Sequence, residues 1–260
     1  MKRLLSFLSF FGVDPIKFIN SISNLPLYFR DLQKIKTQYN SSEKEFTLGK
    51  LYPCLTDRYD SSGKANGHYF HQDLLIARKI FSNNPSTHID VGSRIDGFVS
   101  HVASFRLIKV IDIRPLSNAI TNIEFIQADI IAPLQKSLYE TCDSLSCLHA
   151  LEHFGLGRYG DPIEYYGYLL GLDNLYKLLK PQGKFYLSVP FGPQRIEFNG
   201  QRVFCLTYLL KLLEKQYKLD SFSYVDDQGD LYEDVELSSE SIASNYNSRY
   251  GCAIFEMTKL

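Results

Sequence analysis

The sequence predicts an α/β domain in which a mostly parallel sheet of seven strands carries helices on both faces. Three observations predict it. From residue 86 onward, apolar segments of strand length alternate with helical segments. Residues 86–112 have the pattern of a strand, a glycine-containing turn, a helix and a second strand, the first unit of a nucleotide-type fold. Hydrophobic residues make up 45% and charged residues 22% of the 260-residue chain, as in globular proteins with a sizeable core.

The first strand–turn–helix–strand unit also predicts a ligand site. Strands are expected at residues 88–91 and 107–111, with an apolar helix at residues 98–105 between them. Glycine in the turn lets the backbone approach a ligand closely, and the helix N-terminus offers unpaired N–H groups. Asp112 ends the second strand, where its carboxylate can accept hydrogen bonds from both hydroxyls of a ribose.

The remaining elements follow in order. Further strands are expected at residues 123–127, 142–148, 184–189, 219–225 and 252–258. Helices are expected at residues 67–81, 165–179 and 206–216. The second of these helices stops at a turn over residues 180–183, because glycine is common just past a helix end. Residues 226–246 are acidic and rich in serine, which predicts a mobile loop.

Residues 1–50 are expected to form a helical extension, and residues 51–260 the α/β domain. Possible helix breaks at residues 14–15, 25–26 and 40–42 predict three helical pieces in this extension. Residues 2–11 join two cations to an apolar run that is too short to span a bilayer. We expect a helix that packs on protein there, and peripheral membrane contact through residues 2–11 is the alternative.

Net charge and cysteine content restrict the possible substrates of the protein and its cellular compartment. The net charge is -1 and no basic run stands out, which argues against a nucleic-acid substrate. The five cysteines are scattered, their number is odd and no C-x-x-C occurs. This pattern predicts free thiols and therefore a reducing, cytoplasmic compartment. If residues 2–11 contact a membrane, the protein is expected at the cytoplasmic side of the inner membrane.

The loop after the first strand decides between kinds of nucleotide site. A dinucleotide fingerprint, G-x-G-x-x-G, fails because Arg94 stands at the position of its second glycine. Asp90, Gly92 and Gly97 resemble the D-x-G-x-G-x-G loop that binds S-adenosylmethionine (SAM) in class I methyltransferases, with Arg94 and Asp96 where glycines are usual. A plain turn that binds no nucleotide fits this loop alone equally well.

Six motifs together resemble one family. They are G-H-Y-F-H-Q-D, H-I-D-V-G-S-R-I-D-G-F, V-I-D-I-R-P, L-H-A-L-E-H-F-G-L-G-R-Y-G-D-P, L-K-P-Q-G-K-F-Y-L-S-V-P and F-N-G-Q-R-V-F. Their order and wording resemble the bacterial methyltransferase-like family known as domain of unknown function 268, over roughly residues 51–225. The resemblance implies a Rossmann-like class I methyltransferase fold, a SAM-dependent methyltransferase activity and a place in surface-glycan biosynthesis.

The resemblance to class I methyltransferases also implies a cofactor site. Its residues would be Asp90, Gly92, Arg94, Gly97, Asp112, Asp129 and His149. The glycine loop would flank the methionine part of SAM. Asp112 would hold the ribose, Asp129 would face the adenine, and His149 would lie under the sulfonium. Arg94 departs from the pattern, because a cation beside a sulfonium is unfavourable unless it turns outward or pairs with Asp96 or with the SAM carboxylate.

Methyl transfer to a hydroxyl needs an aligned acceptor, a base and the exclusion of water. Histidine is the side chain best suited as a base near neutral pH. His153 is the expected base and His149 the expected neighbour of the cofactor, with Glu152 or Asp161 as the orienting carboxylate. The alternative is that both histidines only satisfy the loop backbone.

The acceptor pocket is expected on the loops at the ligand edge of the sheet. Its candidate residues are Tyr69, Gln72, Arg158, Tyr159, Arg195, Asn199 and Arg202. Arginines suit a phosphate or carboxylate, so the expected acceptor is a hydroxyl of a nucleotide-sugar or glycan precursor in polysaccharide biosynthesis.

Two alternatives differ in kind. Arg94 and Asp96 in the glycine loop favour a degenerate, non-catalytic scaffold in a glycan-assembly complex, whereas the many polar groups at the ligand edge disfavour it. Residues 149–153 also match H-x-x-E-H, the pattern of a class of zinc hydrolases. That motif needs a helix, and here it follows a strand. A Mg²⁺ ion held by Glu152, Asp161 or Glu197 suits the sequence better than zinc.

Overall fold

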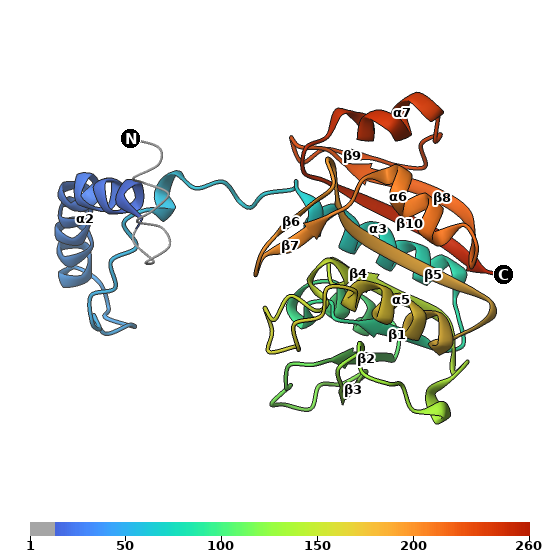
Figure 1. Cartoon of the computed structure of the whole chain (residues 1–260). Helices are drawn as coiled ribbons and strands as arrows, with labels where there is room; N and C mark the ends of the chain where they lie inside the picture. Colours follow the sequence, from blue (N-terminus) through green and yellow to red (C-terminus); the bar gives the residue numbers. More distant parts are fainter. Residues whose placement is uncertain (1–13) are drawn as a thin grey trace. The chain divides into compact units, whose positions relative to one another are not determined.

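The computed structural model describes residues 14–260, which form two compact units (Figure 1). One comprises the described residues up to Lys64, and the other is Ala65–Leu260. The prediction for residues 2–11 lies outside the described residues. Within residues 14–260, no helix is long and apolar enough to cross a membrane.

The N-terminal unit is built on one helix, α2 (Pro15–Asn40). The Asp14 carboxylate caps it by accepting hydrogen bonds from the backbone N–H groups of Ile16 (3.0 Å) and Lys17 (2.9 Å). The helix ends predicted near residues 14–15 and 40–42 are confirmed. The predicted break at Pro26 is wrong, because the helix accommodates a proline that removes one donor from its hydrogen-bond ladder. A single turn, η1 (Asp57–Tyr59), follows in the loop.

The C-terminal unit is organised around an eight-stranded sheet of order β3-β2-β1-β4-β5-β10-β8-β9. Its strands are β1 (His88–Val91), β2 (Ile108–Asp112), β3 (Ile123–Gln127), β4 (Cys142–Leu148), β5 (Leu179–Phe191), β8 (Tyr217–Val225), β9 (Leu231–Tyr232) and β10 (Gly251–Lys259). β1 to β5 pair in parallel, and β10 is antiparallel to both β5 and β8. The predicted Rossmann-like fold with a mostly parallel sheet is confirmed, but the predicted number of seven strands is wrong, because the short strand β9 adds an eighth at the edge.

Helices cover both faces of this sheet, as predicted (Figure 1). They are α3 (His68–Asn83), the π-helical turn η2 (Ile95–Val99) that continues into α4 (Ser100–Ala103), α5 (Gly167–Leu178) and α6 (Leu206–Leu213). Buried residues of α3 and α4 form one hydrophobic cluster with the sheet, and buried residues of α5 and α6 form another. Each fully buried large apolar side chain stabilises the fold by about 1.5–3 kcal/mol.

Two segments differ from their predicted form. Residues 226–246, predicted as a mobile loop, contain β9, α7 (Ser239–Ser244) and the first residues of η5 (Asn245–Asn247). Ser238 caps α7 by accepting a hydrogen bond from the Ser241 N–H (3.1 Å), a local contact that composition does not reveal. The turn predicted at residues 180–183 belongs to β5, which begins at Leu179. Shorter elements are η3 (Lys136–Leu138), η4 (Leu151–His153) and the hairpin of β6 (Arg195–Glu197) and β7 (Gln201–Val203).

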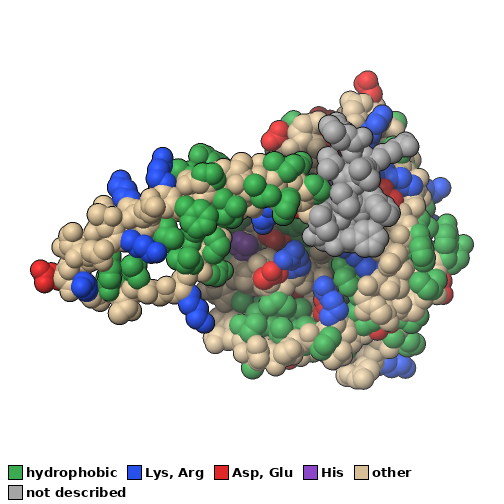
Figure 2. Space-filling view, turned by 90° about the vertical axis from the view of Figure 1, so that its left-hand side faces the viewer, with side chains coloured by type: hydrophobic (Ala, Val, Ile, Leu, Met, Phe, Trp, Pro, Cys, Tyr) green, Lys and Arg blue, Asp and Glu red, His purple; other side chains and the backbone are tan. Residues whose placement is uncertain are grey.

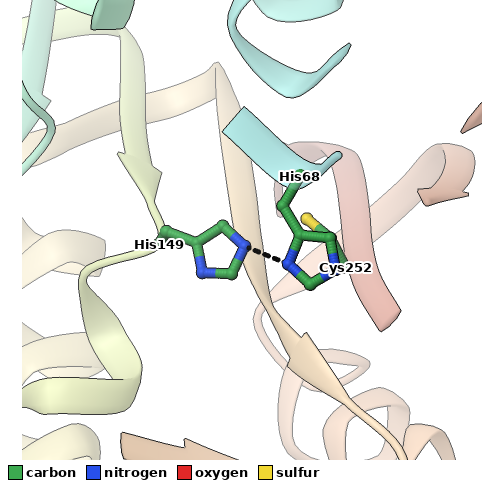
Figure 3. A group of neighbouring side chains, drawn as sticks. All are labelled: His68, His149 and Cys252. Carbon is green, nitrogen blue, oxygen red and sulfur yellow. Dashed lines mark hydrogen bonds between the residues drawn. The ribbon is translucent and has the colours of Figure 1, made fainter. Parts of the chain in front are cut away.

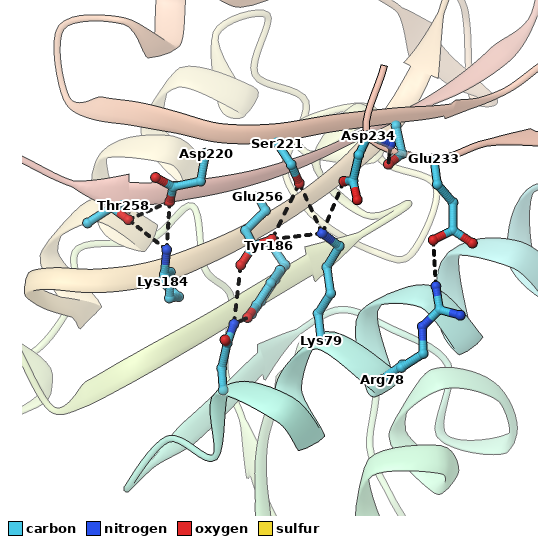
Figure 4. Close-up of polar contacts among 12 residues, drawn as sticks. Arg78, Lys79, Lys184, Tyr186, Asp220, Ser221, Glu233, Asp234, Glu256 and Thr258 are labelled. Atoms are coloured by element: carbon cyan, nitrogen blue, oxygen red, sulfur yellow. Dashed lines mark hydrogen bonds and ion pairs between the residues drawn. The ribbon is translucent and has the colours of Figure 1, made fainter. Parts of the chain in front are cut away.

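A polar network fastens the C-terminal half of α3 to the sheet (Figure 4). Lys79 donates hydrogen bonds to Glu256 of β10 (2.8 Å) and to Ser221 of β8 (3.0 Å). Asn83 donates to the Tyr186 hydroxyl of β5 (2.6 Å). Burial works against the charged form of Lys79, but the bond to Glu256 outweighs it and raises the pKa of the lysine. The network therefore fixes the helix whose other end, at His68, reaches the candidate site.

Candidate active site

A cavity of about 530 Å³ opens at the carboxyl edge of the parallel strands. It is lined by residues that follow β1, β2, β3 and β4 and by the first turns of α3. The predicted site residues that line it are Tyr69, Gln72, Gly92, Arg94, Asp112, Asp129, His149, His153, Arg158, Tyr159 and Asp161. Figure 2 shows acidic, basic and histidine side chains close together on the side of the molecule that faces the viewer.

The turn after β1 brings the backbone close to the cavity. Gly92 has a φ of 79°, and a Cβ atom there would lie 2.7 Å from the Cβ of Ala150, so only glycine fits. Asp90 is fully buried and lies behind the lining. Its carboxylate accepts hydrogen bonds from the Ser93 N–H (3.1 Å), the Ser93 hydroxyl (2.7 Å) and the Ser146 hydroxyl (2.5 Å). Burial raises the pKa of Asp90 to about 7, and the residue shapes the turn from below.

Arg94 and Asp96 form a two-bond ion pair, with Nε–Oδ1 and Nη2–Oδ2 distances of 3.0 and 2.7 Å. The Arg94 side chain is 61% exposed, so the cation is turned toward solvent. The pairing that the sequence required of Arg94 is therefore present. Gly97 lies at the kink of η2, where a Cβ atom would come 2.9 Å from the Oδ2 atom of Asp73.

Asp112, at the tip of β2, is already engaged. Arg114 donates to both of its oxygens, from Nε to Oδ1 (3.0 Å) and from Nη2 to Oδ2 (2.6 Å), and the Arg114 N–H also donates to Oδ1 (2.8 Å). A carboxylate offers about four acceptor positions, and three of these are taken. Two ribose hydroxyls could both bind Asp112 only if the Arg114 guanidinium moved. Asp129 uses one oxygen to accept from the Ile131 N–H (3.0 Å), and Ile113, Ile130 and Ile131 line this end of the cavity.

His149 leaves β4 with a φ of 49°, a conformation that costs energy for a residue with a side chain. Its Nδ1 atom lies 2.7 Å from Oε1 of Glu152, and its Nε2 atom lies 3.2 Å from Nδ1 of His68. Burial works against a charge on His149, but Cys252 and Glu152 outweigh it and raise the pKa of the ring well above the ordinary histidine value. Glu152 is fully buried and lies outside the lining, so it acts on the cavity through His149.

His153 holds one of its two ring nitrogens against the backbone. Its Nδ1 atom lies 2.7 Å from the carbonyl oxygen of Gly200, and since a carbonyl only accepts, the neutral ring carries its proton on Nδ1. Burial lowers the pKa of His153, which favours this neutral form. His153 lines the cavity, and its Nε2 atom lies 3.7 Å from Oε1 of Glu152.

The loop after η4 carries three predicted residues. Asp161 accepts hydrogen bonds from the N–H groups of Gly155 (2.8 Å), Gly157 (3.1 Å) and Tyr159 (3.2 Å), and so shapes the loop. Two guanidinium groups contact the ring of Tyr159: its centroid lies 4.6 Å from Cζ of Arg114 and 5.2 Å from Cζ of Arg158. These three residues form a cationic wall of the cavity, and because Arg114 is paired with Asp112, its positive charge comes from Arg158.

Three predicted acceptor residues lie away from the described lining: Arg195, Asn199 and Arg202. Arg202 is 4% exposed and donates to the carbonyl oxygens of Phe154 (2.6 Å) and Tyr165 (2.9 Å), so it braces the loop. Arg195 pairs with Glu197 (2.8 Å). Asn199 occupies the β6–β7 turn with a φ of 58°.

Two charged lining residues, Asp73 and Arg114, were not among the predicted site residues. Asp73 projects from α3, and burial raises its pKa to about 6. It belongs to the G-H-Y-F-H-Q-D motif, so its position before the first strand was the available signal. Arg114 was visible only as part of V-I-D-I-R-P. The helix that the H-x-x-E-H alternative needs is not formed at residues 149–153, where η4 is one short turn and His153 directs Nδ1 at Gly200.

Solved structures resemble the fold of this chain. The 1,6-didemethyltoxoflavin-N1-methyltransferase of Burkholderia thailandensis, solved with 1,6-didemethyltoxoflavin and S-adenosylhomocysteine, is 14% identical with a TM-score of 0.50, over 72% of this chain and 78% of that one. The [4+2]-cyclase SpnF is 13% identical with a TM-score of 0.52, over 73% of this chain and 80% of that one. At such identities the likeness shows the class I methyltransferase fold alone, and the two proteins perform different reactions.

No curated protein sequence matches the chain. A family model described as "Caenorhabditis protein of unknown function, DUF268" matches residues 109–259, more than half of the 260 residues. This description does not support the bacterial origin that was expected for the family. The motif resemblance and the family match agree on the same family, and the protein belongs to DUF268.

Proposed function

We propose that the protein is a SAM-dependent methyltransferase that acts on a hydroxyl of a small, anionic, sugar-containing acceptor. One observation carries the proposal. The Gly92 turn, Asp112, Asp129 and two histidines, which follow four adjacent parallel strands, line the same cavity. Glycine for close backbone approach, a carboxylate for a ribose and a histidine for a proton are what such a reaction needs.

The cofactor would lie along the ends of β1, β2 and β3. Its methionine part would follow the Gly92 turn, its ribose would meet Asp112, and its adenine would lie among Ile113, Ile130 and Ile131 beside Asp129. SAM supplies an electrophilic methyl group on a sulfonium. The exposed Arg94–Asp96 pair leaves the turn itself without an unpaired cation, which supports binding of a sulfonium nearby.

His153 is the base in this proposal. Its Nδ1–H is held by Gly200, and Nε2 can take the proton of the acceptor hydroxyl as the oxygen attacks the methyl carbon. Bound SAM would supply the methyl group, and His153 would pass the proton of the acceptor hydroxyl on to solvent. His149, fixed by Glu152, would hold the acceptor side of the cavity in shape.

The cationic wall supports an anionic acceptor. Arg158 and Arg114 stack on Tyr159, and a guanidinium suits a phosphate or carboxylate. The proposal does not include Mg²⁺. The carboxylates expected to bind it are engaged: Asp161 with three backbone N–H groups, Glu152 with His149, and Glu197 with Arg195 and Gln201.

A second candidate is a protein of this fold that performs no methyl transfer, such as a scaffold. The two-oxygen bond between Arg114 and Asp112 favours it, because a ribose would find its usual carboxylate occupied. The two candidates differ in whether SAM binds at Asp112.

Calorimetric titration of SAM and S-adenosylhomocysteine into the full-length protein tests this. We expect micromolar binding that Asp112→Ala weakens at least tenfold, about 1.4 kcal/mol. Asp173→Ala is the matched control, since that carboxylate lies on α5, is 56% exposed and is outside the cavity lining. If neither ligand binds to folded wild-type protein, the methyltransferase proposal fails and the scaffold is favoured.

A further inference from the structure

Three side chains with metal-binding atoms converge beside the cavity (Figure 3). They come from distant parts of the chain: His68 from the start of α3, His149 from the end of β4, and Cys252 from β10. A ring nitrogen of each histidine and the Cys252 sulfur all lie within 4.8 Å of one another. His149 and Cys252 are buried, and His68 is partly buried.

The spacing suits a tetrahedral ion. The Nε2 atom of His149 and the Nδ1 atom of His68 are 3.2 Å apart. Zinc–nitrogen bonds of about 2.0–2.1 Å at tetrahedral angles place two ligand nitrogens roughly 3.4 Å apart. The distance between the two nitrogens would therefore change by only a few tenths of an ångström, and the rings would turn so that both lone pairs point at the ion.

The surroundings of His149 direct its lone pair toward this point. Oε1 of Glu152 lies 2.7 Å from Nδ1 of His149, so in a neutral ring the proton sits on Nδ1 and Nε2 faces His68. Metal-binding histidines commonly donate their other ring N–H to a carboxylate in this way.

Charge provides an independent argument. Glu152 is fully buried, and its Oε2 atom has no hydrogen-bond partner among the described residues. A buried carboxylate is costly unless positive charge compensates it. Without a metal, a proton on His149 supplies this charge, and a dication bound at Nε2 would take its place and would also compensate a Cys252 thiolate. The nearby cation Arg202 is not available for this, since its Nη1 atom is directed at the backbone carbonyl oxygens of Glu152 (3.4 Å) and Phe154 (2.6 Å).

We propose that His68, His149 and Cys252 bind one Zn²⁺ ion. Two imidazoles and a thiolate are ligands that zinc accepts in tetrahedral sites. The fourth position would be filled by water or by the amide oxygen of Gln72, which lies 3.8 Å from the Cys252 sulfur. The ion would join the N-terminus of α3, the end of β4 and β10, and so fix the wall that carries Tyr69, Gln72 and His149. This site does not depend on the proposed methyl transfer.

The full-length protein, stripped with a chelator, is titrated with Zn²⁺ against a chromophoric competitor and separately with Co²⁺. We expect one ion per chain, and thiolate-to-cobalt charge-transfer absorption in the wild-type protein. Cys252→Ala should abolish this absorption, whereas Cys147→Ala, which removes another buried thiol outside the group, should keep it. Glu152→Gln should weaken Zn²⁺ binding roughly 10- to 100-fold while retaining the absorption.

Two results would overturn the proposal. One is a folded wild-type protein that binds Co²⁺ without thiolate absorption or binds neither ion. The other is a Cys252→Ala variant that binds Zn²⁺ as tightly as the wild type. In either case the two histidines form only a hydrogen-bonded pair that ends on Glu152. The wild-type spectrum decides the question even if a variant fails to fold.

Discussion

Replacement of Asp90 by asparagine should change how stability depends on pH. Burial raises the pKa of Asp90 from 3.8 to about 7, so the folded protein keeps this proton over a range in which the unfolded chain has lost it. The contribution of Asp90 to stability is therefore greatest below pH 4, falls as the pH rises toward 7, and levels off above that. The asparagine side chain has no proton to lose, so the variant should not show this part of the decrease in stability with rising pH.

The size of the effect follows from the shift. With these two pKa values, the wild-type free energy of unfolding falls by about 2.5 kcal/mol between pH 5 and pH 8 relative to Asp90→Asn. The local hydrogen bonds can survive the change. Ser146 also contacts Nε2 of His88 (3.1 Å), and Ser144 contacts Nδ1 of that ring (2.8 Å). Burial lowers the pKa of His88 to about 3, so the ring is neutral and can exchange its tautomer to reverse the chain of donors.

Urea unfolding of both proteins at pH 5, 6, 7 and 8, followed by circular dichroism, measures the difference directly. Asp173→Asn, at an exposed carboxylate, serves as the control and should track the wild type. A wild-type-minus-variant difference that stays constant from pH 5 to pH 8 would refute the reasoning, because Asp90 would then titrate like an ordinary carboxyl group.

Three further predictions test other parts of the structure. Arg114→Gln removes the ion pair that competes with the cofactor for the Asp112 carboxylate. Calorimetry should then show SAM binding that is about threefold to tenfold tighter. Weaker binding would mean that Arg114 itself contacts the cofactor. Lys79→Met leaves the partly buried carboxylate of Glu256 without its cation. Urea unfolding should show a free energy of unfolding that is lower by about 1–3 kcal/mol. An unchanged value would mean that the network of Figure 4 adds no stability. Gly92→Ala places a side chain on a left-handed backbone, against the Cβ of Ala150. The free energy of unfolding should fall by about 1–3 kcal/mol, and the melting temperature should fall with it. An unaltered melting temperature would show that this position does not require glycine.

The sequence predicted the sheet well because its strands are short apolar segments whose pattern is local. The strands at residues 88–91, 123–127 and 142–148 match the structure in both bounds. The features that the sequence did not predict depend on contacts with other parts of the backbone. Pro26 stays inside a helix, and Ser238 starts one, for reasons set by neighbouring backbone groups.

The site residues also divide into those that a local pattern predicts and those that only the folded structure reveals. Asp112 and His149 were visible because they end strands at the ligand edge. The position of Arg202 was not visible, because carbonyl groups from a different loop determine where its guanidinium lies. The approach of His68 to Cys252 joins residues far apart in the chain, and only the folded sheet brings β10 beside the start of α3.

The buried guanidinium of Arg202 has a consequence for motion. From β7 it reaches carbonyl oxygens on both sides of the loop, at residues 152, 154, 164 and 165. Opening this loop would leave a buried cation without acceptors, so the loop and the β6–β7 hairpin should open together as one cooperative unit. Amide hydrogens of the two segments would then exchange with solvent at matching rates, and entry to the cavity would be governed by that shared opening.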